Sequence, residues 1–412
     1  MTVSSPVKAG LSVDLNAAVD EGRESFGCWN PDAAGWKSAR EAVVEYYRER
    51  GGNFTAGQII LTASTSEAYS VLFKTFCDPG DVILTPMPGY PLLDTLAQLE
   101  HLECAPYFLQ LRRENARKLA TDERREGAAF RFVLDSDSLL AAPEKAKILL
   151  LVSPHNPTGH CISREEWNAA VRFCEENGMV LVVDEVFGDY AFSDKVKRTW
   201  EYVFGLCPPE PSLSQSSPSK SFSAEGRKSI HCRFNDFWDA GGGDFINLPE
   251  DGPKCPIFWL NGLSKAVGSP QLKFGWMAFY APRERFEEIR AALEFVEDAY
   301  LSVSAPAQAL GSALLKQSAA YESRVKERLL QNWQTLREAF PSKYCPEVLG
   351  GWYAVVRLGE DDEDLTLRLL REKHVLVQPG FFFDFDEDGW VVISLLQEPA
   401  LFKEAVRRMA DR

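Results

Sequence analysis

The chain has 412 residues, of which 45% are hydrophobic, 12% aromatic and 25% charged, a composition typical of a soluble globular protein with a large core. Its 60 acidic side chains outnumber the 45 basic ones, giving a formal net charge of −15 without any basic run, so no nucleic-acid partner is expected. This length is enough for two or three packed units.

Targeting and metal-binding patterns are also missing from the sequence. The first residues, MTVSSPVKAGLSVDLNAAVDEG, lack the basic and then apolar order of a signal peptide, and no apolar run reaches the roughly 18 residues of a membrane span. We therefore expect a cytoplasmic protein with no membrane partner. The nine cysteines are scattered and never form C-x-x-C, which predicts reduced thiols. The five histidines show no H-x-x-x-H spacing, so no metal site is expected.

Short apolar runs alternate with amphipathic stretches from about residue 40 to residue 300. Runs this apolar are typical of strands buried on both faces, as in a mainly parallel sheet. Between two of them, Ser163 and Glu166 form a capping-box pattern that opens a helix, and Gly178 is placed to end it. This strand–helix–strand order predicts an α/β fold. The expected strands are, in chain order, QIILTAS, DVILTPM, LECAPYFL, AKILLLVSP, MVLVVDEV, PIFWLNGLS and FGWMAFYAP.

The C-terminal part of the chain has a different pattern. It is helical and charged from about residue 283 to residue 340, and the apolar runs WYAVVRL and WVVISLL then flank another helical stretch, which predicts a smaller α+β unit. Residues 208–255 are rich in Ser, Pro and Gly, so we expect an irregular insertion there, either a lid or, more simply, a plain loop. We predict a large domain of residues 40–295 and a small domain of residues 1–39 and 296–412.

Three polar side chains each follow an apolar run. Asn156 lies in SPHNPTGH after ILLLV, Asp184 follows MVLVV, and Lys265 follows PIFWLNGLS. Each residue alone is more simply interpreted as a turn, a strand end or an ordinary lysine. Ligands of α/β sheets, however, bind at the carboxyl ends of the strands. No G-x-x-x-x-G-K-[ST] pattern and no G-x-G-x-x-G after a strand is present, which excludes the common phosphate loops.

The order of Asn156 in Asn-Pro-Thr-Gly, then Asp184, then Lys265 after Ser264 resembles the class I/II aminotransferases of fold type I, which use pyridoxal 5′-phosphate. The resemblance extends from GWKSAREAVVEYYRERGG near the start to the last helix. It implies a mainly parallel seven-stranded sheet in the large domain and a smaller α+β C-terminal domain. It also implies a homodimer, because family members build each site at a subunit interface.

The resemblance implies a role for each motif residue. Lys265 would form a Schiff base with the cofactor and then move the proton between the substrate Cα and the cofactor. Asp184 would pair with the pyridinium nitrogen and keep it protonated, so that the ring can withdraw electrons. Asn156 would hydrogen-bond the phenolic oxygen, and Tyr90 in PMPGYP would stack on the ring face.

The cofactor phosphate needs N–H donors and positive charge. Ser64, Thr65 and Ser66 lie where an expected strand runs into an expected helix, and free N–H groups at a helix N-terminus bind phosphate, although these residues alone would be an ordinary helix cap. The resemblance adds the hydroxyl of Ser264 and the charge of Lys273, at a position where the family usually carries arginine. Lysine supplies the charge without the bidentate geometry.

Two departures from the family pattern concern the chemistry and the substrate. Phe187 stands where the family usually has a tyrosine that bonds the phenolate oxygen, so we expect the Schiff base to stay protonated to higher pH. Val392, in GWVVISLLQ, stands where the family has the arginine that binds the substrate carboxylate. The substrate is then an amine or an unusual amino acid, or another cation binds its carboxylate. The candidate cations are Arg23, Lys37 and Arg357.

A third departure is Asn30, which falls roughly where a tyrosine commonly reaches the neighbouring subunit's phosphate, so a non-standard substrate pocket is expected. Near the C-terminus, LGGWYAVVRL and QPGFFFDF resemble two loops beside the substrate. Trp352 and Tyr353 are therefore candidate substrate contacts, and a pocket lined by them would suit an apolar substrate. The alternative, that these aromatic residues and Phe381 to Phe383 fill the small-domain core, stays open.

The implied activity is transfer of an amino group from an amino acid or amine to a 2-oxo acid. A carbon–sulfur β-elimination lyase is the alternative, because it uses the same Lys, Asp and Asn and begins with the same Cα deprotonation. A non-catalytic regulatory module that binds pyridoxal phosphate is a further alternative, suggested by Phe187 and Val392. The intact Lys265, Asp184 and Asn156 favour catalysis.

Overall fold

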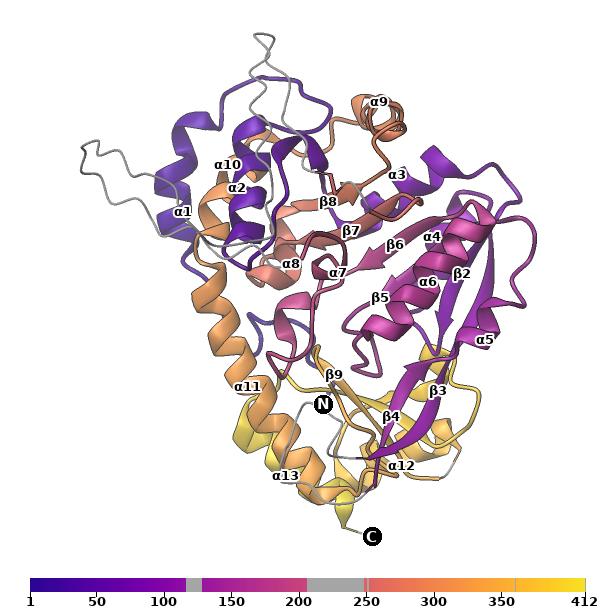
Figure 1. Ribbon diagram of the computed structural model, residues 1–412. Coiled ribbons are helices and arrows are strands. Elements are labelled where there is room, and N and C mark those ends of the chain that lie inside the picture. Colours follow the sequence, from indigo (N-terminus) through magenta and orange to yellow (C-terminus); the bar gives the residue numbers. More distant parts are fainter. Residues whose placement is uncertain (116–127, 206–247, 250–251, 360, 412) are drawn as a thin grey trace, which may run out of the picture.

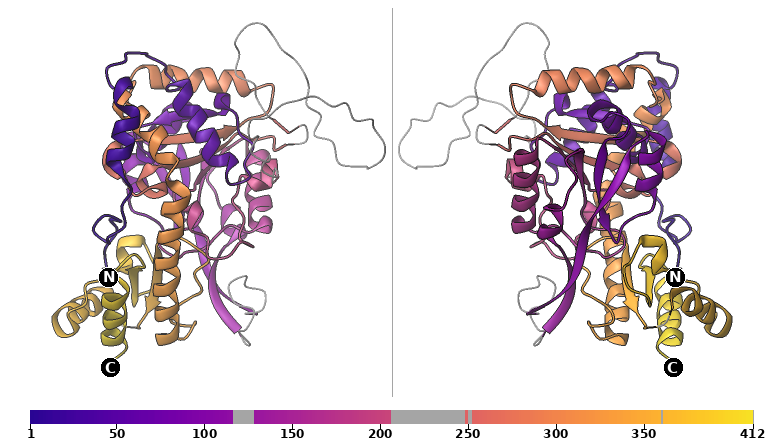
Figure 2. Two further views of the ribbon diagram at one scale, coloured as in Figure 1. Left: turned by 90° about the vertical axis from the view of Figure 1, so that its left-hand side faces the viewer. Right: turned by 90° about the vertical axis from the view of Figure 1, so that its right-hand side faces the viewer.

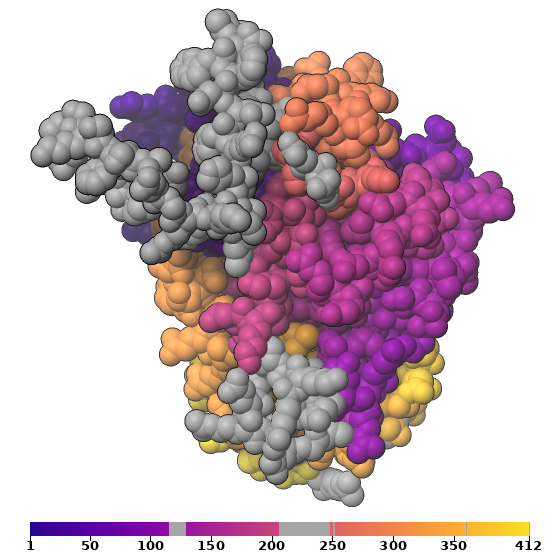
Figure 3. Space-filling model, viewed as in Figure 1, coloured from indigo at the N-terminus to yellow at the C-terminus, as the bar shows by residue number. Residues whose placement is uncertain are grey.

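The large unit of the molecule is a layered sheet with helices on both faces, and a smaller unit lies at one end (Figure 1). In the space-filling view the yellow C-terminal residues lie at the lower end of the molecule, below the magenta residues of the large unit (Figure 3). The predicted insertion at 208–255 falls mostly outside the described residues. This computed structural model describes residues 1–115, 128–205, 248–249, 252–359 and 361–411.

The large sheet has eight strands in the order β1-β8-β7-β6-β5-β2-β3-β4. The five strands from β7 to β3 are mutually parallel, whereas β8 runs antiparallel to both of its neighbours. The strands are β1 (Ile59–Thr62), β2 (Val82–Met87), β3 (Glu103–Asn115), β4 (Ala128–Leu134), β5 (Ala146–Val152), β6 (Val180–Asp184), β7 (Ile257–Gly262) and β8 (Gly275–Tyr280).

The predicted α/β fold with a mainly parallel sheet is confirmed, and the strand number is eight instead of seven. The eighth strand arises because β3 is long. Its first half pairs with β2 up to Phe108, and its second half continues from Leu109 as an antiparallel pair with β4.

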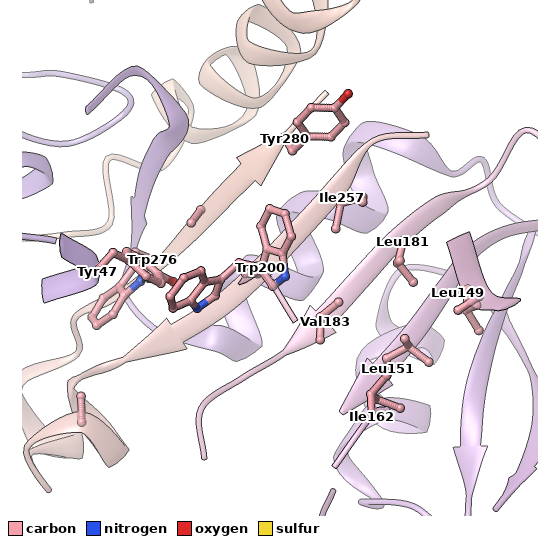
Figure 4. Packing of buried hydrophobic residues seen from close by; sticks show 14 of the residues in the cluster. Tyr47, Leu149, Leu151, Ile162, Leu181, Val183, Trp200, Ile257, Trp276 and Tyr280 are labelled. Atoms are coloured by element: carbon pink, nitrogen blue, oxygen red, sulfur yellow. Dashed lines mark hydrogen bonds between the residues drawn. The ribbon is translucent and has the colours of Figure 1, made fainter. Parts of the chain in front are cut away.

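Alternate residues of the central strands face opposite helical layers, as the two-residue period of a strand requires. In β6, Leu181 and Val183 pack in a cluster with residues of α2 and α6, and Val180 and Val182 pack in a cluster with residues of α3, α4 and α9. Figure 4 shows side chains of the first cluster on neighbouring strands. The helices of this unit are α1 (Leu15–Gly22), α2 (Lys37–Arg48), α3 (Thr65–Phe76), α4 (Leu92–Leu99), α5 (Ser136–Leu139), α6 (Arg164–Asn177), α7 (Glu201–Phe204), α8 (Leu263–Ala266), α9 (Phe286–Asp298) and α10 (Ala305–Leu315).

The predicted capping box opens α6. The Ser163 side chain accepts the Glu166 N–H at 3.2 Å, and the Glu166 carboxylate accepts the Ser163 N–H at 2.7 Å. Gly178 ends the helix with a φ of +64°, a left-handed conformation that favours glycine. The local sequence therefore determines both ends of this crossover helix.

The smaller unit contains a three-stranded sheet in the order β10-β11-β9, which confirms the predicted α+β unit. The N-terminal residues pack on it, since the Ser394 N–H donates to the Met1 carbonyl at 2.8 Å. The side views show α11 running along the molecule toward this unit (Figure 2). The elements are α11 (Ser318–Ala339), β9 (Tyr353–Arg357), α12 (Asp362–Lys373), β10 (Gln378–Pro379), β11 (Trp390–Ser394) and α13 (Pro399–Ala410).

The predicted domain division at residues 40 and 295 stays a prediction. Two helices that it assigns to the small domain, α1 and α10, contact each other, and α10 also contacts α2 of the large unit. Residues of both helices, such as Ala18 and Leu314, belong to the hydrophobic cluster of the large sheet. Within the described part of the chain, no helix is both long and apolar enough to cross a membrane.

Candidate active site

One pocket of about 330 Å³ collects the residues that the motifs single out. Asn156 follows β5, Asp184 is the last residue of β6, and Lys265 lies in α8 directly after β7. Because β5, β6 and β7 are parallel neighbours, their carboxyl ends meet at one edge of the sheet. All nine predicted cofactor contacts line this pocket, namely Ser64, Thr65, Ser66, Tyr90, Asn156, Asp184, Ser264, Lys265 and Lys273.

Asp184 has a hydrogen-bond donor on each carboxylate oxygen. The Tyr69 hydroxyl donates to Oδ2 at 2.7 Å, and the Val186 backbone N–H donates to Oδ1 at 3.0 Å. Burial raises the pKa of Asp184, and these two donors together with the nearby Lys265 amine oppose that rise. The carboxylate therefore has a fixed orientation and an environment that partly supports its charge.

The Lys265 amine is buried against aromatic rings. Its Nζ lies 4.7 Å from the ring centroid of Trp352 and 5.2 Å from that of Phe187. Burial lowers the pKa of Lys265 to about 8, although the Asp184 charge acts in the opposite direction. An amine with this pKa is partly neutral, and hence nucleophilic, near neutral pH.

The N-terminus of α3 forms another part of the pocket wall. The Ser64 side chain accepts the Glu67 N–H at 3.2 Å, so Ser64 is also an ordinary helix cap. Thr65 and Ser66 begin the helix beside it. The first residue of β8, Gly275, is needed here because a Cβ at this position would lie 3.1 Å from the Ser64 backbone. Ser64, Thr65 and Ser66 all line the pocket, so the start of this helix contributes to its wall.

These side chains fit pyridoxal phosphate. The Asn156 Oδ1 is buried with no partner among the described residues, so a polar atom in the pocket is still unsatisfied. The helix N-terminus and Lys273 offer N–H donors and charge for a phosphate, and Asp184 offers an anion for a ring cation. No group of three or more His, Cys, Asp or Glu side chains that could hold a metal ion occurs in the described ranges.

Tyr69 was not predicted from the sequence, yet among the described residues it is the only side chain that donates a hydrogen bond to Asp184. A signal for it exists, because Tyr69 is four residues after Thr65 and therefore lies on the same face of α3. Its contact with Asp184, however, joins α3 to β6. This contact could not be predicted, because neither segment of sequence specifies the order of strands in the sheet.

The two predicted substrate contacts differ in position. Tyr353 lines the pocket, whereas Trp352 is fully buried and packs against Phe187 and Tyr190. The Tyr190 hydroxyl donates to the Lys265 backbone carbonyl at 2.6 Å, so this tyrosine does not present its hydroxyl to the pocket. Of the three phenylalanines from 381 to 383, two are exposed and one is buried, and none lines the pocket.

Val392 is fully buried in β11, where it pairs with Gln378 and Val355. The predicted alternative cations lie outside the pocket as the described residues form it. Arg23 pairs with Asp20, Lys37 is exposed at the start of α2, and Arg357 pairs with Glu387. Among the described lining residues, the cations are Lys265 and Lys273.

The chain matches the family described as aminotransferase class I and II over residues 20–229 and 234–409, and it therefore belongs to this family. The fold type I relationship inferred from the motifs is confirmed, and class I/II aminotransferases use pyridoxal 5′-phosphate.

Similar proteins carry aminotransferase names. Glutamate-pyruvate aminotransferase AlaA of Haemophilus influenzae is 22% identical over 396 residues, covering 92% of this chain and 81% of that protein. Tyrosine aminotransferase of Caenorhabditis elegans is 20% identical over 387 residues, covering 92% of this chain and 69% of that protein. A solved aminotransferase structure from Escherichia coli has a TM-score of 0.73 at 18% identity, over 99% of this chain and 88% of that one. Alanine aminotransferase from Pyrococcus furiosus has a TM-score of 0.72 at 20% identity, over 99% and 90%.

Proposed function

We propose that this chain is a pyridoxal-phosphate-dependent aminotransferase that moves an amino group from an amino acid or amine to a 2-oxo acid at the pocket around Lys265. The main support for the proposal is that Asn156, Asp184 and Lys265 lie together at one edge of the sheet, next to the N-terminus of α3. Membership in the aminotransferase class I and II family supports it.

The bound cofactor supplies a ring that withdraws electrons from the substrate Cα, which makes loss of the Cα proton feasible. Lys265 provides the amine that holds the aldehyde group and later accepts and returns the Cα proton at Nζ. The Asp184 carboxylate would hold positive charge at the ring nitrogen, and Asn156 would hydrogen-bond the phenolic oxygen. Tyr90, which is half exposed at 46%, covers the ring face.

The phosphate group would be held by Ser64, Thr65 and Ser66 at the start of α3, together with the Ser264 hydroxyl and the Lys273 ammonium, which line the same pocket. α3 is 12 residues long, so its N-terminus carries a helix dipole as well as free N–H groups. With Lys273 on the phosphate and Lys265 on the aldehyde, no other cation remains in the described lining.

Because both lysines of the pocket are assigned to the cofactor, the pocket favours a donor with an apolar side chain. Amines should therefore be tested beside amino acids in the first panel of substrates. Phe187 and Tyr353 are packed against each other, with ring centroids 6.0 Å apart, and form an aromatic wall. Aromatic walls of this kind suit apolar groups.

We also propose a homodimer. Trp29 and Phe295 are each 81% exposed and Tyr300 is 57% exposed, which is unusual for large aromatic side chains in a monomer. Trp29 and Asn30 line a small cavity together with Glu297 and Leu301, so Trp29 lies beside the C-terminal end of α9. Light scattering after size-exclusion chromatography tests this, and Trp29→Asp together with Phe295→Asp should shift a dimer toward monomer. A cytoplasmic location stays a prediction from the sequence.

The experiment that tests the function is a visible spectrum of the purified holoprotein during titration with a panel of amines and amino acids. A true donor should remove the absorption of the Lys265-bound cofactor, and a 2-oxo acid should restore it. Release of pyruvate and ammonia without any acceptor would instead support the carbon–sulfur lyase. A protein that binds the cofactor but responds to no donor would contradict both activities.

A further inference from the structure

We propose that Tyr69 is a positioning residue that acts through Asp184 to keep the ring nitrogen of the cofactor protonated. This inference rests on the proposed function, because it assigns the ring nitrogen to Asp184. Its physical basis is a hydrogen bond of 2.7 Å from the Tyr69 hydroxyl to Asp184 Oδ2.

The geometry fixes the Asp184 carboxylate from both sides. One oxygen accepts the Tyr69 hydroxyl, and the other accepts the Val186 backbone N–H at 3.0 Å. Tyr69 is itself held in place, because it is only 3% exposed and packs against Phe73 on α3, with ring centroids 6.1 Å apart. A carboxylate accepts several hydrogen bonds, so Asp184 can still accept one from a protonated ring nitrogen.

The hydrogen bond also affects where that proton resides. Between a pyridinium and a carboxylate, the proton stays on nitrogen when the carboxylate is a weak base, and a hydroxyl donor makes the carboxylate a weaker base. Tyr69 stays a neutral donor, because burial and the Asp184 charge raise its pKa well above the usual value. The other charged groups acting on Asp184 are Lys265, which supports its negative charge, and Glu185, which opposes it.

Glu185 does not hydrogen-bond the Asp184 carboxylate, because its own carboxylate is bound to other residues. It accepts from the Arg198 guanidinium at 2.8 Å and from the Thr199 hydroxyl at 2.6 Å. Tyr69 is thus the side chain that adjusts Asp184 directly. It lies one helical turn after Thr65, so α3 connects the phosphate end of the pocket with the ring-nitrogen end.

The test compares Tyr69→Phe with Tyr107→Phe in the holoprotein. Tyr107 is a matched control, because it is also a buried tyrosine but its hydroxyl donates to the Leu150 carbonyl at 2.9 Å instead of to Asp184. The readout is the ¹⁵N chemical shift of ring-labelled pyridoxal phosphate bound to each protein without substrate. Tyr69→Phe should move the shift toward that of a neutral pyridine, and Tyr107→Phe should leave it unchanged. An identical shift in wild type and Tyr69→Phe would overturn the proposal.

Kinetics give a second readout. The first-order rate of the donor half-reaction should fall at least about 10-fold in Tyr69→Phe at unchanged cofactor content. If Tyr69→Phe does not fold, 3-fluorotyrosine at position 69 keeps the shape and strengthens the donor. It should then move the ¹⁵N shift toward the protonated ring, and no movement would contradict the inference. The ¹⁵N measurement needs bound cofactor but no turnover, so an inactive wild-type protein would refute the proposed function separately.

Discussion

The Lys265 amine nitrogen lies 4.7 Å from the centre of the Trp352 ring, on a tryptophan that is fully buried. The ring face attracts a cation, yet it also keeps water away from the amine. The loss of hydration on burial outweighs the opposing effect of the Asp184 charge, and the pKa of Lys265 falls to about 8. The aromatic rings beside Lys265 contribute to this burial and so to the reactivity of the amine.

The first prediction concerns the pH dependence of cofactor binding to the apoprotein. Only the neutral amine attacks the aldehyde, so the rate of chromophore formation should rise with pH and level off above about 8, instead of near 10.5, the usual pKa of a lysine. Stopped-flow absorbance between pH 6 and pH 10 checks this. A rate that still rises between about pH 9 and pH 10 would show that burial does not lower the pKa of this amine.

Asp184→Asn should separate cofactor binding from catalysis. An amide cannot hold positive charge at the ring nitrogen, so the half-reaction with a donor should slow by at least about 100-fold, and the cofactor should stay bound. The neighbouring Glu185→Gln is the contrast, since Glu185 is bonded to Arg198 and Thr199. It should lower the free energy of unfolding by about 2 kcal/mol and change the half-reaction little. Equal rates in Asp184→Asn and wild type would remove Asp184 from its assigned role.

Phe187→Tyr should restore a hydrogen-bond donor to the pocket wall. Phe187 lines the pocket beside Lys265, and a hydroxyl there could stabilise the phenolate oxygen. We expect the visible absorption change of the holoprotein to occur at a pH lower by about 1. Tyr190→Phe is the control, because its hydroxyl bonds the Lys265 carbonyl outside the pocket, and it should leave the spectral titration unaltered. Identical titrations of wild type and Phe187→Tyr would contradict the prediction.

Glu297 should make stability depend on pH. Burial, and to a smaller extent the charge of nearby Glu67, raises the pKa of Glu297 from 4.5 to about 8. The Oε1 atom of Glu297 has no partner among the described residues. Between pH 4.5 and pH 8 the folded protein therefore holds a proton that the unfolded chain has lost, so stability falls as pH rises through this range and levels off above it.

Glu297→Gln should remove most of this dependence. Its free energy of unfolding in urea should exceed that of wild type by at least about 1 kcal/mol at pH 8 and match it near pH 5. Glu294→Gln, one turn earlier in an ion pair with Arg290, should differ from wild type by less than about 1 kcal/mol at both pH values. The same pH dependence of stability in Glu297→Gln and in wild type would show that Glu297 is ionised when folded.

The sequence predicted seven of the eight strands of the large sheet, because each of these is a continuous apolar run, but it did not predict β4. Asp184 and Lys265 come directly after such runs, which is why both line one pocket at the end of the strands. The sequence was not sufficient for contacts between distant elements. Tyr69 meets Asp184 only because the sheet brings α3 beside the end of β6. Trp352 and Tyr353 alternate in direction, so one is buried under Lys265 and the other lines the pocket, and the pattern of aromatic residues does not tell them apart.

The central claim is that the Lys265 amine holds the cofactor. The most direct measurement is borohydride reduction of the holoprotein, followed by proteolysis and mass spectrometry to find the modified lysine. Lys273 lines the same pocket and serves as the internal comparison. We expect the reduced cofactor on Lys265 alone, and none in Lys265→Ala. A cofactor attached to Lys273, or wild-type turnover by Lys265→Ala, would contradict the account.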